Sequence, residues 1–228
     1  MIISDEEEFV FIHNPKCGGT TVRDSLKQFD THAHWFWGQT RINDFPIDKA
    51  HMSLAIVRMH FPEVFKLMER YFVFGVVRNP YKRVISSYNE VFFKEFENVI
   101  NGRESFDSYR DKLNEFVLNI RAEQIKGWTQ SHRHFILQKN MFYVGRKCYA
   151  DLILKLEELN EAPKALSIFS QGLGKVSETW ATRKNERKKG SIDLSIENVL
   201  TKRAFKKIEQ LYSDDFELFG FDKIKSTE

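Results

Sequence analysis

The sequence predicts an α/β fold with a central, mainly parallel β-sheet flanked by helices. Two segments carry this prediction, because each joins an apolar run, typical of a strand buried on both faces, to a helix. The first joins a strand at 8–14 to a helix at 19–29, and the second joins a strand at 71–77 to a helix that begins at Pro80. A third apolar run, at 149–156, predicts another core strand.

Length and composition indicate one domain. The chain has 228 residues, 27.0 kDa and 21 phenylalanines, which is enough for a full hydrophobic core. We therefore predict a single domain over residues 1–228, with a helical insertion at about 97–127. The net charge is only +3 and the charges are interspersed, so we expect no binding to nucleic acid.

The N-terminus and the number of cysteines bear on where in the cell the protein is expected. No apolar run is long enough to span a membrane, and the N-terminus MIISDEEEF is acidic where a signal peptide would be basic. Cys17 and Cys148 are too few for a disulfide framework. We expect a cytoplasmic protein without a transmembrane segment, while removal of an N-terminal anchor stays open.

The first strand leads into a loop suited to binding an anion. Residues 8–21 read EFVFIHNPKCGGTT, so two glycines free of side chains can close their backbone N–H groups around a phosphate at a helix N-terminus. Lys16 adds a positive charge, and two threonines add hydroxyl donors. The residues predicted to bind the ligand are Lys16, Cys17, Gly18, Gly19, Thr20 and Thr21.

The second strand ends in a polar turn. Residues 71–77, YFVFGVV, run to Arg78, and Asn79 and Pro80 then end the strand. Proline at this place suits the first turn of a helix, which continues with apolar residues at helical spacing. The full stretch reads RNPYKRVISSY.

PKCGGTT and RNPYKRVISSY resemble the two phosphate-binding motifs of sulfotransferases, and they stand in that family's order. The first is similar to the 5′-phosphosulfate loop for 3′-phosphoadenosine 5′-phosphosulfate (PAPS), the sulfonate donor. Arg78 and Ser86 resemble the pair that grips the donor's 3′-phosphate. The resemblance implies a P-loop-type three-layer sandwich and in-line transfer of a sulfonate to an acceptor hydroxyl. The second motif is closer to the carbohydrate branch, so we expect a glycan or glycoconjugate acceptor.

Lys16 and His51 are the predicted catalytic residues. Lys16 would neutralise charge on the leaving phosphate oxygen. The acceptor hydroxyl needs a base, and His51 in DKAHMSLAIV resembles the histidine at that place in heparan 2-O-sulfotransferases and related bacterial proteins. The alternative is that His51 caps a helix or fills a polar niche. His32 and His34 are the next candidates, in a segment where Trp35 and Trp37 could line an acceptor cleft.

We expect no metal ion. Arg78 ends the second strand where the Walker B strand of a nucleotide triphosphatase would present a metal-binding aspartate. The HxH pairs formed by His32 and His34, and by His132 and His134, lack the further ligands of a zinc site.

Three weaker similarities concern later segments. Arg187 and Lys188, within the basic run 183–190, resemble the RKG segment with which cytosolic sulfotransferases wrap the 3′-phosphate; a solvated loop or a site that attracts an acidic acceptor are the alternatives. Glu157 resembles the glutamate at the end of the family's late strand. Gln130 and Ser131 resemble a segment of carbohydrate sulfotransferases, and we assign them no role.

Two other functions compete with sulfonate transfer. A P-loop kinase would use Mg-ATP, but Lys16 precedes both glycines here, whereas a Walker A loop ends in Gly-Lys-Ser/Thr. A non-catalytic nucleotide-binding protein would have lost its base, and the retained Lys16 argues against it. The oligomeric state stays open, because the aromatic helix predicted at 105–120 suits a dimer face as well as a lid.

Overall fold

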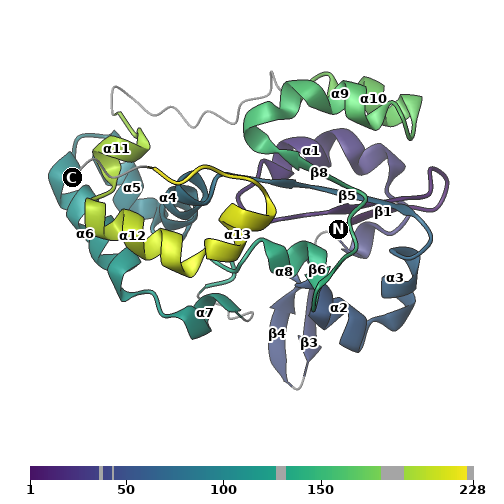
Figure 1. Ribbon diagram of the computed structural model, residues 1–228, viewed down its shortest axis with the longest axis horizontal. Helices are drawn as coiled ribbons and strands as arrows, with labels where there is room; N and C mark the ends of the chain where they lie inside the picture. The colour runs from purple at the N-terminus through teal and green to yellow at the C-terminus, as the bar shows by residue number, and fades with distance from the viewer. Residues whose placement is uncertain (36–37, 43, 127–131, 181–192, 225–228) are drawn as a thin grey trace.

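The computed structural model of the protein describes residues 1–228 except 36–37, 43, 127–131, 181–192 and 225–228. A four-stranded sheet lies at the centre in the order β1-β2-β5-β8 (Figure 1). Its strands are β1 (Ile2–Ser4), β2 (Phe9–Ile12), β5 (Phe72–Val77) and β8 (Leu152–Lys155). β2, β5 and β8 are parallel, and β1 is antiparallel to β2. The predicted α/β fold with a mainly parallel sheet is confirmed.

Helices cover both faces of this sheet, which makes three layers (Figure 1). One face carries α1 (Gly19–Leu26), α9 (Ala162–Leu166) and α10 (Gln171–Ser177). The other carries α2 (Leu54–His60), α3 (Pro62–Leu67) and α8 (Lys139–Phe142). Alternate side chains of each strand enter the two cores, so the strands read as continuous apolar runs.

A helical cluster with its own hydrophobic core lies beside the sheet (Figure 1). It contains α4 (Pro80–Val91), α5 (Phe93–Ile100), α6 (Phe106–Asn119), α11 (Ile196–Val199), α12 (Lys202–Leu211) and α13 (Ser213–Leu218), with α7 (Ala122–Lys126) next to it. Tyr109, Leu113 and Val117 of α6 are buried within this core. The apolar face of the helix that we predicted at 105–120 therefore packs largely against other helices of the same chain.

The remaining described elements are short. Two-residue to four-residue strands form two hairpins, β3 (Gln39–Ile42) with β4 (Phe45–Asp48) and β6 (Tyr143–Val144) with β7 (Lys147–Cys148). Four 3-10 turns complete the described elements: η1 (Lys27–Phe29), η2 (Ala33–Trp35), η3 (Lys49–His51) and η4 (Leu156–Glu161). None of the described helices is both long and apolar enough to cross a membrane.

Two stretches in which apolar residues recur at helical spacing, 48–69 and 196–212, are not continuous helices. The stretch at 48–69 is divided into η3, α2 and α3, because Pro62 cannot continue α2 and instead starts α3. The stretch at 196–212 breaks at Leu200, which is extended, and Thr201 then caps α12 by accepting a hydrogen bond from the Ala204 N–H. Both breaks follow from local chemistry that the apolar spacing alone does not reveal.

Candidate functional site

The loop between β2 and α1 is folded around two residues with left-handed backbone. Lys16 has φ of 63° and Gly18 has φ of 75°, and Gly18 is the N-cap of α1. A lysine rarely adopts such a conformation, so the rest of the loop must hold it in place. Strain of this kind is often found at ligand-binding sites, and here it falls on the residue that we predicted to be catalytic.

The two glycines of the loop are required for different reasons. A Cβ atom on Gly19 would lie 1.9 Å from the ring of His13, so packing excludes a side chain there. At Gly18 the only close neighbour of such an atom among the described residues is the flexible end of Leu156, and the φ of 75° is what favours glycine. The sequence explained both glycines by the approach of an anion to the backbone, and the structure adds these two reasons.

Arg78, at the end of β5, contacts the first motif. Its Nη1 donates a hydrogen bond to the Lys16 carbonyl at 3.2 Å. Burial lowers the pKa of the guanidinium, although the nearby Glu157 carboxylate acts in the opposite direction. Its Nε is buried and meets no acceptor within the described part of the chain. The two predicted phosphate motifs therefore meet, and a cationic N–H donor between them is left without a partner.

Gln138 ties the two motifs together, and no sequence pattern pointed to it. Its buried side-chain oxygen accepts hydrogen bonds from Asn14 Nδ2 at 3.0 Å and from the Arg78 N–H at 2.9 Å. It also accepts from Cys17 Sγ at 3.3 Å, and its Nε2 donates to the Arg78 carbonyl at 2.9 Å. A single glutamine thus fixes the loop after β2 relative to the loop after β5.

The buried side chain of Arg83 stabilises the loop after β2 and the segment before α8 by hydrogen bonds to their backbone. It is 1% exposed, its Nε donates to the Pro15 carbonyl at 3.1 Å, and its Nη2 donates to the Ile136 carbonyl at 2.7 Å. The fully buried Asp215 accepts from the Gln138 and Lys139 N–H groups at 2.9 and 3.0 Å. Burial raises the pKa of Asp215, while the Arg83 charge acts to lower it. Arginine and aspartate therefore compensate each other's buried charge.

Lys16 forms an ion pair across the site. Its Nζ lies 3.0 Å from Oε2 of Glu90 on α4, and the lysine and glutamate side chains are 21% and 36% exposed. A partly exposed pair of this kind contributes only about 1 kcal/mol, so an arriving anion can compete for the ammonium. Glu90 lies four residues after Ser86, and no motif in the sequence singles it out.

Cys17 is a packing residue in this structure. It is 1% exposed, and its thiol donates to the Pro15 carbonyl at 3.4 Å as well as to Gln138. Burial raises the pKa of the thiol to about 12, although the charges of Arg83 and Arg78 act to lower it. A thiol in this state is a poor nucleophile, so the structure gives Cys17 a place in the loop as a spacer.

His51 lies beside the loop in a cluster of three imidazoles. Its Nδ1 is 2.6 Å from Oδ2 of Asp48, and its ring centroid is 5.1 Å from those of both His13 and His134. Because the His13 ring covers Gly19, the cluster adjoins the start of α1. The sequence presented His134 only as half of an HxH pair, and the structure brings it to His51.

The two neighbours of His51 stay neutral. Burial, followed by the proximity of His51, lowers the pKa of His134 to about 3 and holds that of His13 well below its usual value. An unfolded chain binds protons at both positions below about pH 6.5, whereas the folded chain does not. The stabilisation from these histidines is therefore complete above about pH 6.5 and is lost as the pH falls.

We expect the melting temperature to fall between about pH 6.5 and 5, with each of the two histidines costing about 1.4 kcal/mol per pH unit. Thermal unfolding across this range measures the loss. The variant His134→Asn should show a shallower pH dependence, while His60→Asn, at the exposed end of α2, should follow the wild type. An unchanged slope in the His134 variant would contradict the assignment.

Other predicted residues are placed differently. Ser86 is half-buried on α4 and forms no hydrogen bond with Arg78 among the described residues. Glu157 accepts the Asn79 N–H at 3.2 Å, which places it beside the second motif. Thr20 is exposed and Thr21 is buried at the start of α1. Arg187, Lys188, Trp37, Gln130 and Ser131 lie outside the described residues.

His32 and Trp35, in the segment after the first helix, do not have the places that the sequence suggested. His32 Nε2 lies 2.8 Å from Oδ2 of Asp5, in the turn that precedes β2, so it is at the opposite end of that strand from Lys16. Trp35 is 5% exposed and packs edge-on against Phe61 with 4.9 Å between ring centroids. The prediction that Trp35 lines an open cleft is therefore not supported, and it is a core residue.

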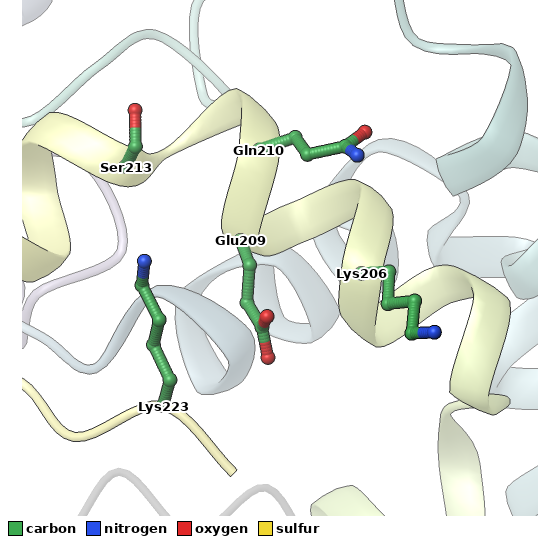
Figure 2. Close-up of a pocket in the computed structure, with 5 residues that line it drawn as sticks. All are labelled: Lys206, Glu209, Gln210, Ser213 and Lys223. Atoms are coloured by element: carbon green, nitrogen blue, oxygen red, sulfur yellow. The ribbon is translucent and has the colours of Figure 1, made fainter. Parts of the chain in front are cut away.

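Metal ligands and surface pockets are the other places where a ligand could bind in the described part of the chain. In the described ranges no three histidine, cysteine, aspartate or glutamate side chains are arranged to hold a metal ion. Figure 2 shows a polar surface pocket far along the chain from both motifs, lined by Lys206, Glu209, Gln210, Ser213 and Lys223. Glu209 there accepts a hydrogen bond from the Tyr81 hydroxyl at 2.5 Å. This pocket contains none of the predicted site residues.

Comparison with known proteins agrees with the geometry. A family model described as "Sulfotransferase family" matches residues 1–222, which is nearly the whole chain. Searches of curated proteins and of solved structures give no significant match. Members of this family move a sulfonate group and generally use PAPS as its donor. The predicted family, and with it the prediction that the protein is an enzyme, are confirmed: the chain belongs to the sulfotransferase family.

Proposed function

We propose that this protein transfers the sulfonate group of PAPS to a hydroxyl of a carbohydrate or glycoconjugate. The observation that supports this donor best is the state of Arg78. Its Nη1 holds the carbonyl of Lys16, while its buried Nε has no acceptor among the described residues. A buried guanidinium donor is costly to leave unpaired, so the site is suited to an anion held between the two motifs.

The residues present fit the two anionic ends of the donor. Lys16 and the backbone of Gly18 and Gly19, at the start of α1, would hold the 5′-phosphosulfate. Arg78 and Ser86 would hold the 3′-phosphate, and the resemblance of the segment to the family's RKG sequence leads us to propose Arg187 and Lys188 as further contacts with it. When bound, PAPS supplies a sulfonate on a phosphate leaving group, and no residue of the chain needs to form a covalent intermediate.

Lys16 and His51 would carry the chemistry. The ammonium of Lys16 stabilises the charge that develops on the leaving phosphate oxygen as the bond from that oxygen to sulfur breaks. His51 accepts the proton of the acceptor hydroxyl while the acceptor oxygen bonds to sulfur. With Nδ1 of His51 facing Asp48, the nitrogen available for that proton is Nε2. We propose that no metal takes part, because Arg78 supplies positive charge at the strand end.

The proposal is tested by ligand-dependent thermal unfolding. At about a hundred times its Kd, adenosine 3′,5′-bisphosphate should stabilise the protein by about 2.7 kcal/mol, which raises the melting temperature by roughly 5 to 10 °C. Mg-ATP and adenosine 5′-monophosphate, which both lack the 3′-phosphate, should give smaller shifts. A larger shift with Mg-ATP would favour a P-loop kinase. The acceptor is then sought with labelled donor and a panel of glycans.

A further inference from the structure

Asp48 is held at both of its carboxylate oxygens. It is the last residue of β4 and the N-cap of η3, where its Oδ1 accepts the Ala50 N–H at 2.9 Å. Its Oδ2 lies 2.6 Å from Nδ1 of His51. Because the strand, the cap and the histidine lie within four consecutive residues, local backbone geometry fixes the carboxylate relative to the imidazole.

The carboxylate stays ionised near neutral pH. Burial acts to raise the pKa of Asp48, but the hydrogen bond and charge of His51, the Ala50 N–H and the charge of Arg133 together lower it. An ionised carboxylate only accepts hydrogen bonds. The contact at 2.6 Å therefore requires a proton on Nδ1 of His51, which leaves the lone pair of the neutral imidazole on Nε2.

Packing also restricts the orientation of the His51 ring. The residue is 8% exposed, and the rings of His13 and His134 lie 5.1 Å away at interplanar angles of 42° and 70°. Both neighbours are neutral at pH 7 because their pKa values are lowered. The titratable groups that face the pair among the described residues are thus two neutral imidazoles, the Arg133 guanidinium and the buried N-terminal amine of Met1. Burial lowers the pKa of that amine to about 5, so it is also neutral at pH 7, and Asp48 is the anion whose contact with the ring fixes the proton on Nδ1.

We propose that Asp48 is a positioning residue that keeps His51 in the Nδ1–H form, so that Nε2 is free to accept the proton of the acceptor hydroxyl. This inference rests on the proposed function, in which His51 is the base. A histidine in the other tautomer would present an N–H to the acceptor and could not take its proton. The carboxylate would also stabilise the imidazolium that forms during transfer, as in other acid–histidine pairs.

The variant Asp48→Asn separates the effect of Asp48 on the His51 tautomer from its role as the N-cap of η3. Its side-chain oxygen can still accept the Ala50 N–H, but its NH₂ group donates to Nδ1 and favours the Nε2–H form of His51. Long-range proton–nitrogen correlation spectra of the labelled protein report the tautomer directly. We expect Nδ1–H in the wild type and Nε2–H in the variant, whether or not any acceptor is present.

Kinetics give the second measurement. General-base catalysis contributes about a hundredfold or more, so the variant should lose about tenfold to a hundredfold in kcat while KM for the donor stays within about twofold. The effect of adding Asp48→Asn to His51→Ala should be small, because the two residues act as a unit. Asp30→Asn is the matched control, since Asp30 also accepts backbone N–H groups, from Ile3 and His32, but does not touch His51.

Failure of this inference can be told apart from failure of the proposed function. An Nε2–H tautomer in the wild type, which needs no variant to measure, would overturn the inference. So would a variant whose tautomer changes while kcat does not. If no acceptor is sulfonated by the wild type, the proposed function fails, and the inferred link to catalysis fails with it. The spectra would still decide whether Asp48 controls the tautomer.

Discussion

Exchanging Lys16 for alanine should lower kcat by about a hundredfold to a thousandfold, while adenosine 3′,5′-bisphosphate still binds within a few-fold of the wild-type affinity. The ammonium of Lys16 is most valuable when charge develops on the leaving oxygen, so its loss acts mainly on the transition state. The nucleotide product keeps its contacts with Arg78 and the loop backbone. Steady-state rates with labelled donor and calorimetric titration of the nucleotide measure the two quantities.

Three further variants sharpen this prediction. Arg78→Ala should give the opposite pattern, with much weaker nucleotide binding, because Arg78 is proposed to hold a phosphate rather than the reacting centre. Glu90→Gln breaks the ion pair with Lys16 but keeps the ammonium, so it should retain most of the activity. Lys27→Ala, at the exposed start of η1, controls for a general loss of positive charge. Normal transfer in the Lys16 variant would overturn the proposed roles.

Replacing Arg83 by methionine should destabilise the protein by about 3 to 5 kcal/mol. Methionine retains much of the side-chain volume, so the loss of stability comes mainly from the missing hydrogen bonds and charge. The Pro15 and Ile136 carbonyls lose their donor, and the buried Asp215 loses the cation that offsets its charge. A buried aspartate without such a cation is strongly disfavoured. For a chain of this length the melting temperature should fall by on the order of 10 °C.

Urea and thermal unfolding of Arg83→Met measure this effect. Lys82→Met is the matched control, because Lys82 is the preceding residue of α4 and is exposed. It should unfold within about 0.5 kcal/mol of the wild type. If the two variants were equally stable, the two carbonyl contacts and the charge compensation by Asp215 would not contribute as the structure suggests.

The parts of the site that follow directly from strand ends could be predicted from the sequence. The parallel strands β2 and β5 are neighbours in the sheet, and the carboxyl ends of parallel strands lie at one edge. Two apolar runs, one leading to Lys16 and the other to Arg78, therefore indicate that these residues meet. The observed contact between Arg78 Nη1 and the Lys16 carbonyl agrees with this reasoning.

The residues that hold the site together could not be predicted in the same way. Gln138 contacts Arg78 across 60 positions of sequence, and Glu90 contacts Lys16 across 74. A buried glutamine or a half-exposed glutamate has no periodicity of its own, so its partners depend on how distant helices pack. Asp48 is different: an aspartate three residues before His51, where a helical stretch begins, is a capping signal that the sequence does contain.

The hydrogen bonds of Asp215 have a consequence for the whole molecule. This residue of α13 anchors the backbone of Gln138, whose side chain in turn fixes Asn14 and Arg78. Through Gln138, α13 thereby stabilises both phosphate motifs, although none of its side chains belongs to either motif. Substitutions in α13 should then weaken the affinity for the sulfonate donor and leave kcat largely unchanged. A screen of variants would therefore wrongly assign such residues to direct contacts with the donor.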